Sequence, residues 1–125
     1  MRLSILTALA ALALAPAAAA HTETDDFAWA TDAVYYSGHP HTDVVWGSRF
    51  GDWFWGHGGP DRLYGFTGAD QLTGGDGHDR LYGQDGNDVV FGGDGDDVIY
   101  CGNGDGDWAS GGRGLDIYHD CETTA

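Results

Sequence analysis

An aspartate recurs every nine residues through most of this 125-residue chain, and this period limits the folds that the chain can adopt. From residue 38 the sequence divides into consecutive nine-residue units with aspartate at the sixth position: Asp43, Asp52, Asp61, Asp70, Asp79, Asp88 and Asp97. A ten-residue unit follows, and the period then continues through Asp107 and Asp116. A fixed period of this kind is typical of repeat architectures in which each unit stacks on its neighbours.

Glycine and apolar residues also hold fixed places within the units. Glycine occupies position 1 in eight of the nine units, with Cys101 as the exception, and it occupies position 4 from Gly59 onward. Position 8 is apolar throughout, as expected for a short strand whose middle residue points inward. Each unit is therefore predicted to form a six-residue turn, where glycine permits left-handed backbone, followed by a three-residue strand.

Such short strands cannot bury a hydrophobic face alone, so successive coils must stack. If one coil contains two units, each unit lies on the unit two further along, at a strand spacing of about 4.8 Å. One sheet would then stack Val45, Leu63, Leu81 and Ile99 inward, and the other would stack Phe54, Leu72, Val90 and Ala109. The aspartates would form two rows, one on each turn edge.

The units GGDGHDRLY, GQDGNDVVF and GGDGDDVIY match the pattern G-G-x-G-x-D-x-U-x. Through these units, residues 56–119 closely and residues 38–55 loosely resemble the haemolysin-type calcium-binding repeats of RTX proteins. The resemblance implies an all-β, right-handed parallel β-roll with Ca²⁺ held between stacked turns by position-6 carboxylates and turn carbonyls. The implied ligands are Asp61, Asp70, Asp79, Asp88, Asp97, Asp107 and Asp116, with Gly75, Gly77, Gly86, Gly93 and Gly95.

The chemistry of the turns agrees with calcium. Ca²⁺ prefers 6–8 oxygen ligands at about 2.3–2.6 Å, and two stacked glycine-rich turns can supply such a set where one cannot. The first two units lack glycine at position 4, which argues against calcium there. Further acids at turn positions 3 and 5 either solubilise the chain or create a field that raises cation affinity: Asp76, Asp85, Asp94, Asp96 and Asp105.

The first 20 residues have the features of a secretory signal peptide. Arg2 supplies a positive n-region, residues 3–15 form an apolar h-region, and small residues suited to cleavage end at Ala20. A membrane anchor is the alternative, but the stretch is short and alanine-rich beside the ~20 strongly apolar residues that a span requires. We expect a secreted or periplasmic protein without a membrane span once the leader is removed. It would comprise an aromatic N-terminal cap at 21–37, the roll at 38–119 and a tail at 120–125.

The net charge limits the classes of partner. The formal charge is −15, and removal of a leader that contains Arg2 and no acid makes it 4 − 20 = −16. Such a surface repels nucleic acid and anionic lipid. No Ser/His/Asp or paired-carboxylate constellation stands outside the repeat, so we expect no enzyme. The sequence predicts a calcium-binding structural or interaction module whose folding is coupled to Ca²⁺.

The two cysteines are predicted to form a disulfide. An even number of cysteines in an exported protein favours this pairing, and a cysteine metal site is the weaker alternative because no C-x-x-C spacing is present. Two units beyond Cys101 lies Asp120, so Cys121 falls on the same edge one residue later. Stacking would bring the two Cα atoms within the disulfide range of about 4.4–6.8 Å.

Aromatic residues at position 9 form outward rows, with Trp46, Tyr64, Tyr82 and Tyr100 on one sheet and Trp55 and Phe91 on the other. These rows either stabilise the sheets through cross-strand pairs or form a platform for an extracellular glycan or protein. The second interpretation makes a secreted adhesive or carbohydrate-binding module the alternative function.

His39, His41 and His57 could begin a transition-metal site, but surface histidines are the better interpretation because a third ligand at suitable spacing is not evident.

The predicted leader can be tested directly. We expect exported protein to begin within a few residues of His21, because the alanine run that ends at Ala20 provides the cleavage site. The intact mass of exported protein measures this. Exported protein that retains Met1 would show that the segment is not a cleaved leader.

Overall fold

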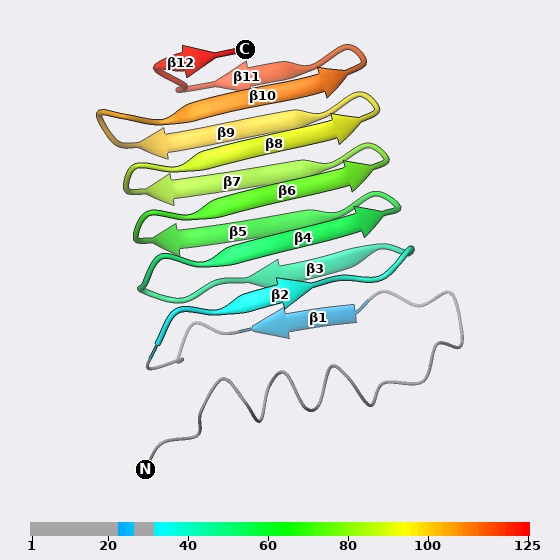
Figure 1. The fold of residues 1–125 in the computed structure, drawn as a ribbon, viewed down its shortest axis with the longest axis horizontal. Coiled ribbons are helices and arrows are strands. Elements are labelled where there is room, and N and C mark those ends of the chain that lie inside the picture. Colours follow the sequence, from blue (N-terminus) through cyan, green and yellow to red (C-terminus); the bar gives the residue numbers. More distant parts are fainter. Residues whose placement is uncertain (1–22, 27–31) are drawn as a thin grey trace.

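The computed structural model describes residues 23–26 and 32–125, and it shows two parallel six-stranded sheets wound as a solenoid (Figure 1). The predicted parallel β-roll is confirmed. The proposed leader, and Phe27 and Trp29 of the proposed cap, lie outside the described residues. Within the described residues we find no helix with the length and apolar character of a membrane span.

The chain changes sheet at every turn, so odd-numbered and even-numbered strands form separate layers (Figure 1). The odd-numbered sheet contains β1 (Glu23–Asp26), β3 (Asp43–Trp46), β5 (Arg62–Thr67), β7 (Arg80–Asp85), β9 (Val98–Asn103) and β11 (Ile117–His119). The even-numbered sheet contains β2 (Tyr35–Ser37), β4 (Trp53–Gly58), β6 (Gln71–Asp76), β8 (Val89–Asp94), β10 (Trp108–Arg113) and β12 (Thr123–Thr124).

The strands from β4 to β10 are six residues long rather than the three predicted. Each continues from positions 7–9 of one unit through positions 1–3 of the next. The register between β5 and β7 runs through Tyr64↔Tyr82, omits position 1, and resumes at Phe66↔Gln84. Phe66 and Gln84 have φ of 80° and 79°, so a left-handed residue at position 2 bends the strand while pairing between coils continues.

The two predicted inward rows form most of the core, which also includes Val34, Tyr36 and Cys101. Leu63 pairs with Leu81 and Leu81 with Ile99, and all three side chains are fully buried. The even-numbered sheet stacks Phe54, Leu72, Val90 and Ala109 in the same way. The two layers therefore meet along one line of side chains per sheet, and the core lengthens with each coil instead of thickening.

At both ends of the roll, residues outside the regular repeat contact residues of the repeat. At the N-terminal end, Tyr36 on β2 is 3% exposed and packs edge-on against Phe54, with 6.2 Å between ring centroids. At the C-terminal end, the predicted disulfide is present, with 5.1 Å between the Cα atoms of Cys101 and Cys121. A bridge with a sequence separation of 20 stabilises the fold by about 3 kcal/mol in the chain-entropy model.

The thin core makes each inward residue important. We expect Leu81→Ala to lower the free energy of unfolding by about 2–5 kcal/mol, because it leaves a cavity at a fully buried site. Leu115→Ala is the matched control: its side chain is 81% exposed, so a change within about 0.5 kcal/mol is expected. Urea denaturation in saturating calcium measures both. Equal effects of the two substitutions would contradict this description of the core.

Candidate metal centre

The position-6 aspartates form two hydrogen-bonded ladders, one along each turn edge of the roll. From Asp61 to Asp116, each aspartate Oδ1 accepts a hydrogen bond from the backbone N–H of the aspartate one coil earlier. On one edge Asp61 N–H donates to Asp79 Oδ1 at 2.8 Å, and Asp79 N–H donates to Asp97 Oδ1 at 2.9 Å. The other edge repeats the arrangement with Asp70 and Asp88, at 2.9 Å. The carboxyl groups therefore link successive coils.

The second carboxyl oxygen of these residues is buried without a hydrogen-bond partner. This holds for Oδ2 of Asp61, Asp70, Asp79, Asp88, Asp97 and Asp107. Burial of an ionised carboxylate is costly unless its charge is balanced and its oxygens are satisfied. Six unpartnered oxygens in two regular rows therefore indicate that protons or cations complete the turns.

The electrostatics of the ladders lead to the same conclusion. Burial raises the pKa of Asp61 and Asp70 from the ordinary 3.8 to about 7, against the lowering effect of the backbone hydrogen bond that each accepts. Burial likewise raises the pKa of Asp79, Asp88 and Asp97 to about 6. Nearby carboxylates raise these pKa values further. The rows thus resist carrying their full negative charge without a counter-charge.

From Asp61 to Asp97, each unpartnered oxygen faces a recess at a position-1 glycine. A Cβ at Gly74 would overlap Asp79 Oδ2 and would lie 2.7 Å from the carbonyl oxygen of Gly92. The same combination of carboxylate and carbonyl oxygen recurs at six other position-1 glycines: Gly38, Gly47, Gly56, Gly65, Gly83 and Gly92. Sequence reasoning did not identify the position-1 carbonyls as candidate ligands, although glycine at this position in nearly every unit was a signal of close packing.

The turn glycines that the resemblance implied as ligands direct their carbonyls at the next coil. The carbonyl oxygen of Gly75 abuts Gly93, and that of Gly77 abuts Gly95. The carbonyls of Gly86, Gly93 and Gly95 abut Gly104, Gly112 and Gly114 in the same way. Only glycine tolerates both this approach and its own left-handed φ, which is 119° at Gly93 and 137° at Gly95. Their role as ligands stays a prediction.

The first two units satisfy their aspartates in a different way. Ser48 N–H donates to Asp52 Oδ2 at 2.6 Å, and Ser48 Oγ and Val34 N–H donate to Asp52 Oδ1 at 2.9 and 2.8 Å. Likewise, His39 N–H donates to Asp43 Oδ2 at 2.7 Å. In each later unit, beginning with the one that contains His57, the residue at position 2 has a left-handed backbone. The aspartates of these units, from Asp61 to Asp107, are the ones whose Oδ2 lacks a hydrogen-bond partner. Protein donors therefore occupy, in the early turns, the place that a cation would take in the later ones.

The C-terminal end of one ladder uses a glutamate. Asp107 N–H donates to Glu122 Oε2 at 3.0 Å, so Glu122 takes the place of the next aspartate on that edge. Glu122 lies outside the nine-residue period, so sequence reasoning did not identify it. The only feature that could have indicated it is its position directly after Cys121. On the other edge Asp97 N–H donates to Asp116 Oδ1 at 3.0 Å, and Asp116 is half-buried.

The donor set suits a hard cation. Across residues 23–26 and 32–125, no group of three or more His, Cys, Asp or Glu side chains is placed to hold a metal ion. A cation in these turns must therefore complete its shell with backbone oxygens, which Ca²⁺ accepts readily.

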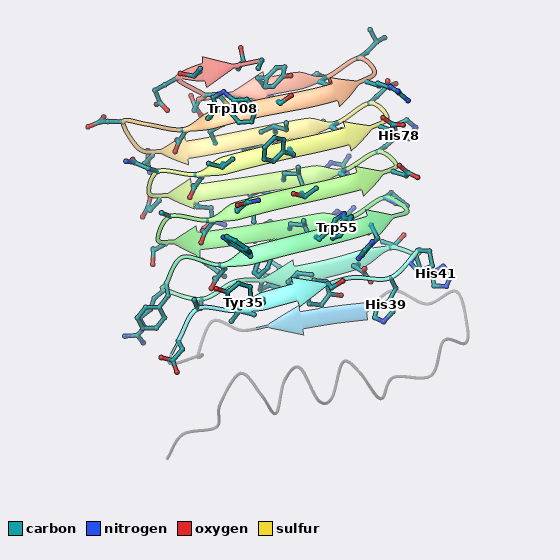
Figure 2. All side chains as sticks on the ribbon, in the orientation of Figure 1. Tyr35, His39, His41, Trp55, His78 and Trp108 are labelled. Atoms are coloured by element: carbon teal, nitrogen blue, oxygen red, sulfur yellow. A yellow bond between two sulfur atoms is a disulfide. The ribbon has the colours of Figure 1, made fainter. Side chains whose placement is uncertain are left out.

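Figure 2 shows His39, His41 and His78 at the turn edge of the roll. His78 Nδ1 accepts a hydrogen bond from Asp96 N–H at 2.9 Å.

The acids at turn positions 3 and 5 are all exposed to solvent: Asp76, Asp85, Asp94, Asp96 and Asp105. Asp94 contacts Arg113 at 3.3 Å, and Asp85 accepts a hydrogen bond from Asn103 at 2.9 Å. Their exposure favours a solubilising role, and it separates them from the buried ladders.

The aromatic row of the odd-numbered sheet is a continuous stack. Ring centroids lie 4.1 Å apart for Trp46 and Tyr64, 4.6 Å for Tyr64 and Tyr82, and 4.8 Å for Tyr82 and Tyr100. His119 stacks on Tyr100 at 4.5 Å. Each inner ring of the stack has its two faces covered by its neighbours, so the geometry favours cross-strand stabilisation for this row.

Comparison with known families identifies the repeat. A model of the RTX calcium-binding nonapeptide repeat matches four times, at residues 37–72, 46–80, 64–99 and 73–106. Together the matches cover residues 37–106, which is 70 of 125 residues. No curated protein and no solved structure matches the chain at a significant level. The matched range includes the aspartates with an unpartnered oxygen from Asp61 to Asp97.

The raised pKa values predict how the metal-free protein responds to pH. An aspartate whose pKa is higher in the folded than in the unfolded chain binds its proton more tightly when folded. Its stabilising effect is full below the unfolded pKa of 3.8 and is lost as pH rises through the folded values of about 6 and 7. We therefore expect metal-free protein to be more ordered at about pH 5 than at about pH 8.

Far-ultraviolet circular dichroism of metal-stripped protein across this pH range measures the effect. The same series in saturating calcium is the control, and its pH dependence should be smaller because the cation replaces the protons. Order that increases with pH in metal-free buffer would contradict the assignment.

Proposed function

Because the chain belongs to the family of RTX calcium-binding nonapeptide repeats, we propose that it is an exported module whose folding is coupled to calcium. The family's repeats bind Ca²⁺ and are structural modules. We propose as ligands the ladder aspartates Asp61, Asp70, Asp79, Asp88, Asp97, Asp107 and Asp116, with carbonyls of the turn glycines. The observation that supports this most strongly is the row of buried Oδ2 atoms without a protein partner.

The balance of energies supports coupling between calcium and folding. The core contributes one side chain per sheet and coil, whereas the ladders bury carboxylates that repel one another. Ca²⁺ recognises the folded turns and hardly the open chain, so each site held at 100 times its dissociation constant adds about 2.7 kcal/mol. A few such sites match the ~5–15 kcal/mol net stability of typical domains. Calcium is thus proposed to be the organiser of the fold.

A location outside the cytoplasm is supported by the disulfide and agrees with the proposed calcium binding. The Cys101–Cys121 disulfide persists in oxidising compartments. Calcium modules outside cells work at dissociation constants of about 10⁻⁴–10⁻³ M, so millimolar calcium would fill these sites after export. We propose that the chain crosses the membrane largely unfolded and folds where calcium is abundant.

Calcium titration tests the proposal, with Asp79→Ala and Asp52→Ala as a matched pair. Without calcium we expect a largely disordered chain at about pH 7.5, and with calcium a β-rich one after a steep transition. Asp79→Ala should raise the calcium midpoint and reduce the number of bound ions, because Asp79 Oδ2 lacks a protein partner. Asp52→Ala should leave the number of bound ions unchanged, because protein donors satisfy the Asp52 carboxylate.

Far-ultraviolet circular dichroism gives the midpoint, and isothermal titration calorimetry gives the stoichiometry. Because Asp52→Ala removes hydrogen bonds, it can lower stability, and the stoichiometry separates that effect from calcium binding. An identical β-rich spectrum in chelator and in calcium would show that calcium does not organise this fold.

A further inference from the structure

We propose that the outer face of the even-numbered sheet carries a binding groove for a neutral carbohydrate, built on Tyr35, Trp53 and Trp55. The groove has a volume of about 310 Å³, at the lower end of the ~300–1,000 Å³ typical of small-ligand sites. Its wall and floor come from three adjacent strands, β2, β4 and β6. Figure 2 shows Tyr35 and Trp55 on the first two of these strands.

The three aromatic side chains of the groove are exposed although the fold does not require them there. Tyr35, Trp53 and Trp55 are 50%, 55% and 52% exposed. In the register of the sheet, Trp53 is followed by Gln71 and Trp55 by Thr73 on the next strand, so smaller polar residues also fill these positions. A cluster of large exposed aromatic groups in a soluble protein marks an interaction site.

On the face that surrounds the groove, the two outward rows carry no charge, whereas the exposed Asp76 and Asp94 lie at the ends of β6 and β8. From β2 to β10 its two outward rows consist of Tyr35, Trp53, Gln71, Val89 and Trp108, and of Ser37, Trp55, Thr73, Phe91 and Ser110. These ten positions are neutral in a chain with 20 acids, whereas the odd-numbered sheet presents Arg62 and Arg80 outward. The lining thus complements an uncharged ligand rather than a cation or an anion.

The aromatic groups are held in place by their neighbours. His57 stacks on one face of Trp55 at 4.1 Å, and the His57 Nε2 is hydrogen-bonded to Ser37 Oγ at 2.8 Å. Trp53 contacts Tyr35 edge-on, with 5.4 Å between ring centroids. Among the described residues no second ring covers Trp55, so its other face is available. A preorganised surface of this kind loses little side-chain freedom on binding.

The mixture of groups in the groove distinguishes a sugar from an apolar partner. Gln71 and Thr73 line it beside the rings, and they offer an amide and a hydroxyl that can donate and accept hydrogen bonds. A pyranose has an apolar face of C–H groups that packs on an aromatic ring, and hydroxyl groups at its rim that match such side chains. A purely apolar partner would bury these polar groups without compensation. The odd-numbered sheet offers no equivalent, because its rings cover one another.

The groove depends on the proposed calcium function only through the folded roll. Its lining residues belong to β2, β4 and β6 and exclude the ladder aspartates. If the chain proves equally folded without calcium, a sugar titration of the folded protein still tests the groove.

The test is titration of the full chain in saturating calcium with neutral glucose, xylose and mannose oligosaccharides, and with oligogalacturonate as an anionic probe. We expect at least one neutral oligosaccharide to bind with a dissociation constant on the order of micromolar to millimolar, and the anionic probe to bind more weakly. Trp53→Ala and Trp55→Ala should each weaken binding about tenfold or more. Trp108→Ala is the matched control, because Trp108 lies in the same outward row as Trp53 but outside the groove.

Isothermal titration calorimetry measures the affinities, and circular dichroism with an unchanged calcium midpoint shows that each variant is folded. If one groove variant fails to fold, the other gives the comparison, and Gln71→Ala provides a third change that removes a polar group. The proposal is overturned if no neutral oligosaccharide binds the folded chain, or if Trp108→Ala weakens binding as much as Trp53→Ala. It is also overturned if sedimentation shows a dimer that Trp53→Ala abolishes, because a second copy would then cover the groove.

Discussion

The burial of carboxylates, reinforced by their mutual repulsion, is the constraint on which the rest of the roll depends. One oxygen of each ladder aspartate joins two coils through a backbone hydrogen bond, and the other oxygen is left to a proton or a cation. The position-1 glycines follow from this arrangement, because a Cβ at Gly74 would overlap the carboxylate of Asp79. The left-handed residue at position 2 is explained in the same way. In the two early units that lack it, the backbone N–H of the position-2 residue donates a hydrogen bond to the position-6 carboxylate. The glycine at position 1 and the left-handed residue at position 2 are thus both explained by the need to accommodate the buried carboxylates.

Much of this arrangement could be predicted from spacing alone. A period of nine with two units per coil fixes which residues stack, so the rows of Leu63 and Leu72 and the pairing of Cys101 with Cys121 followed from counting. The six-residue strands did not follow from the sequence, because the glycine-rich start of each unit is typical of a turn. In the structure, pairing between coils continues through this segment, although Phe66 has a positive φ. Glu122 could not be found because it enters its ladder from an irregular tail with no period. The local donors to Asp52 depend on the backbone angle at Ser48, which the sequence pattern does not show.

The two outer faces of the roll differ in how they use aromatic residues. On the odd-numbered sheet, flat rings at equal spacing stack along the solenoid axis and become part of its framework. On the even-numbered sheet, Gln71 and Thr73 interrupt the rows, so Trp53 and Trp55 have no aromatic neighbour on the next strand. The sequence showed aromatic residues on both faces, but only the lateral neighbours decide whether a ring is covered. The same residue type at equivalent register thus acts as structure on one face and remains available on the other.

The alternation of units between sheets determines how such a chain can change its length. Ladder partners lie 18 residues apart in the regular region, so the gain or loss of one nonapeptide would transfer every later unit to the opposite sheet. The stacked rings, both carboxylate rows and the partner of Cys101 would all change sides at once. The gain or loss of a whole coil preserves every lateral neighbour except at the point of insertion. The extra residue of the ten-residue unit is tolerated because it lies within the turn between Asn103 and Trp108, where it leaves the strand phase intact. Insertions and deletions in the repeat region should therefore add or remove pairs of units. The two-unit coil, and not the single nonapeptide, is the unit by which the length of this protein can change during evolution.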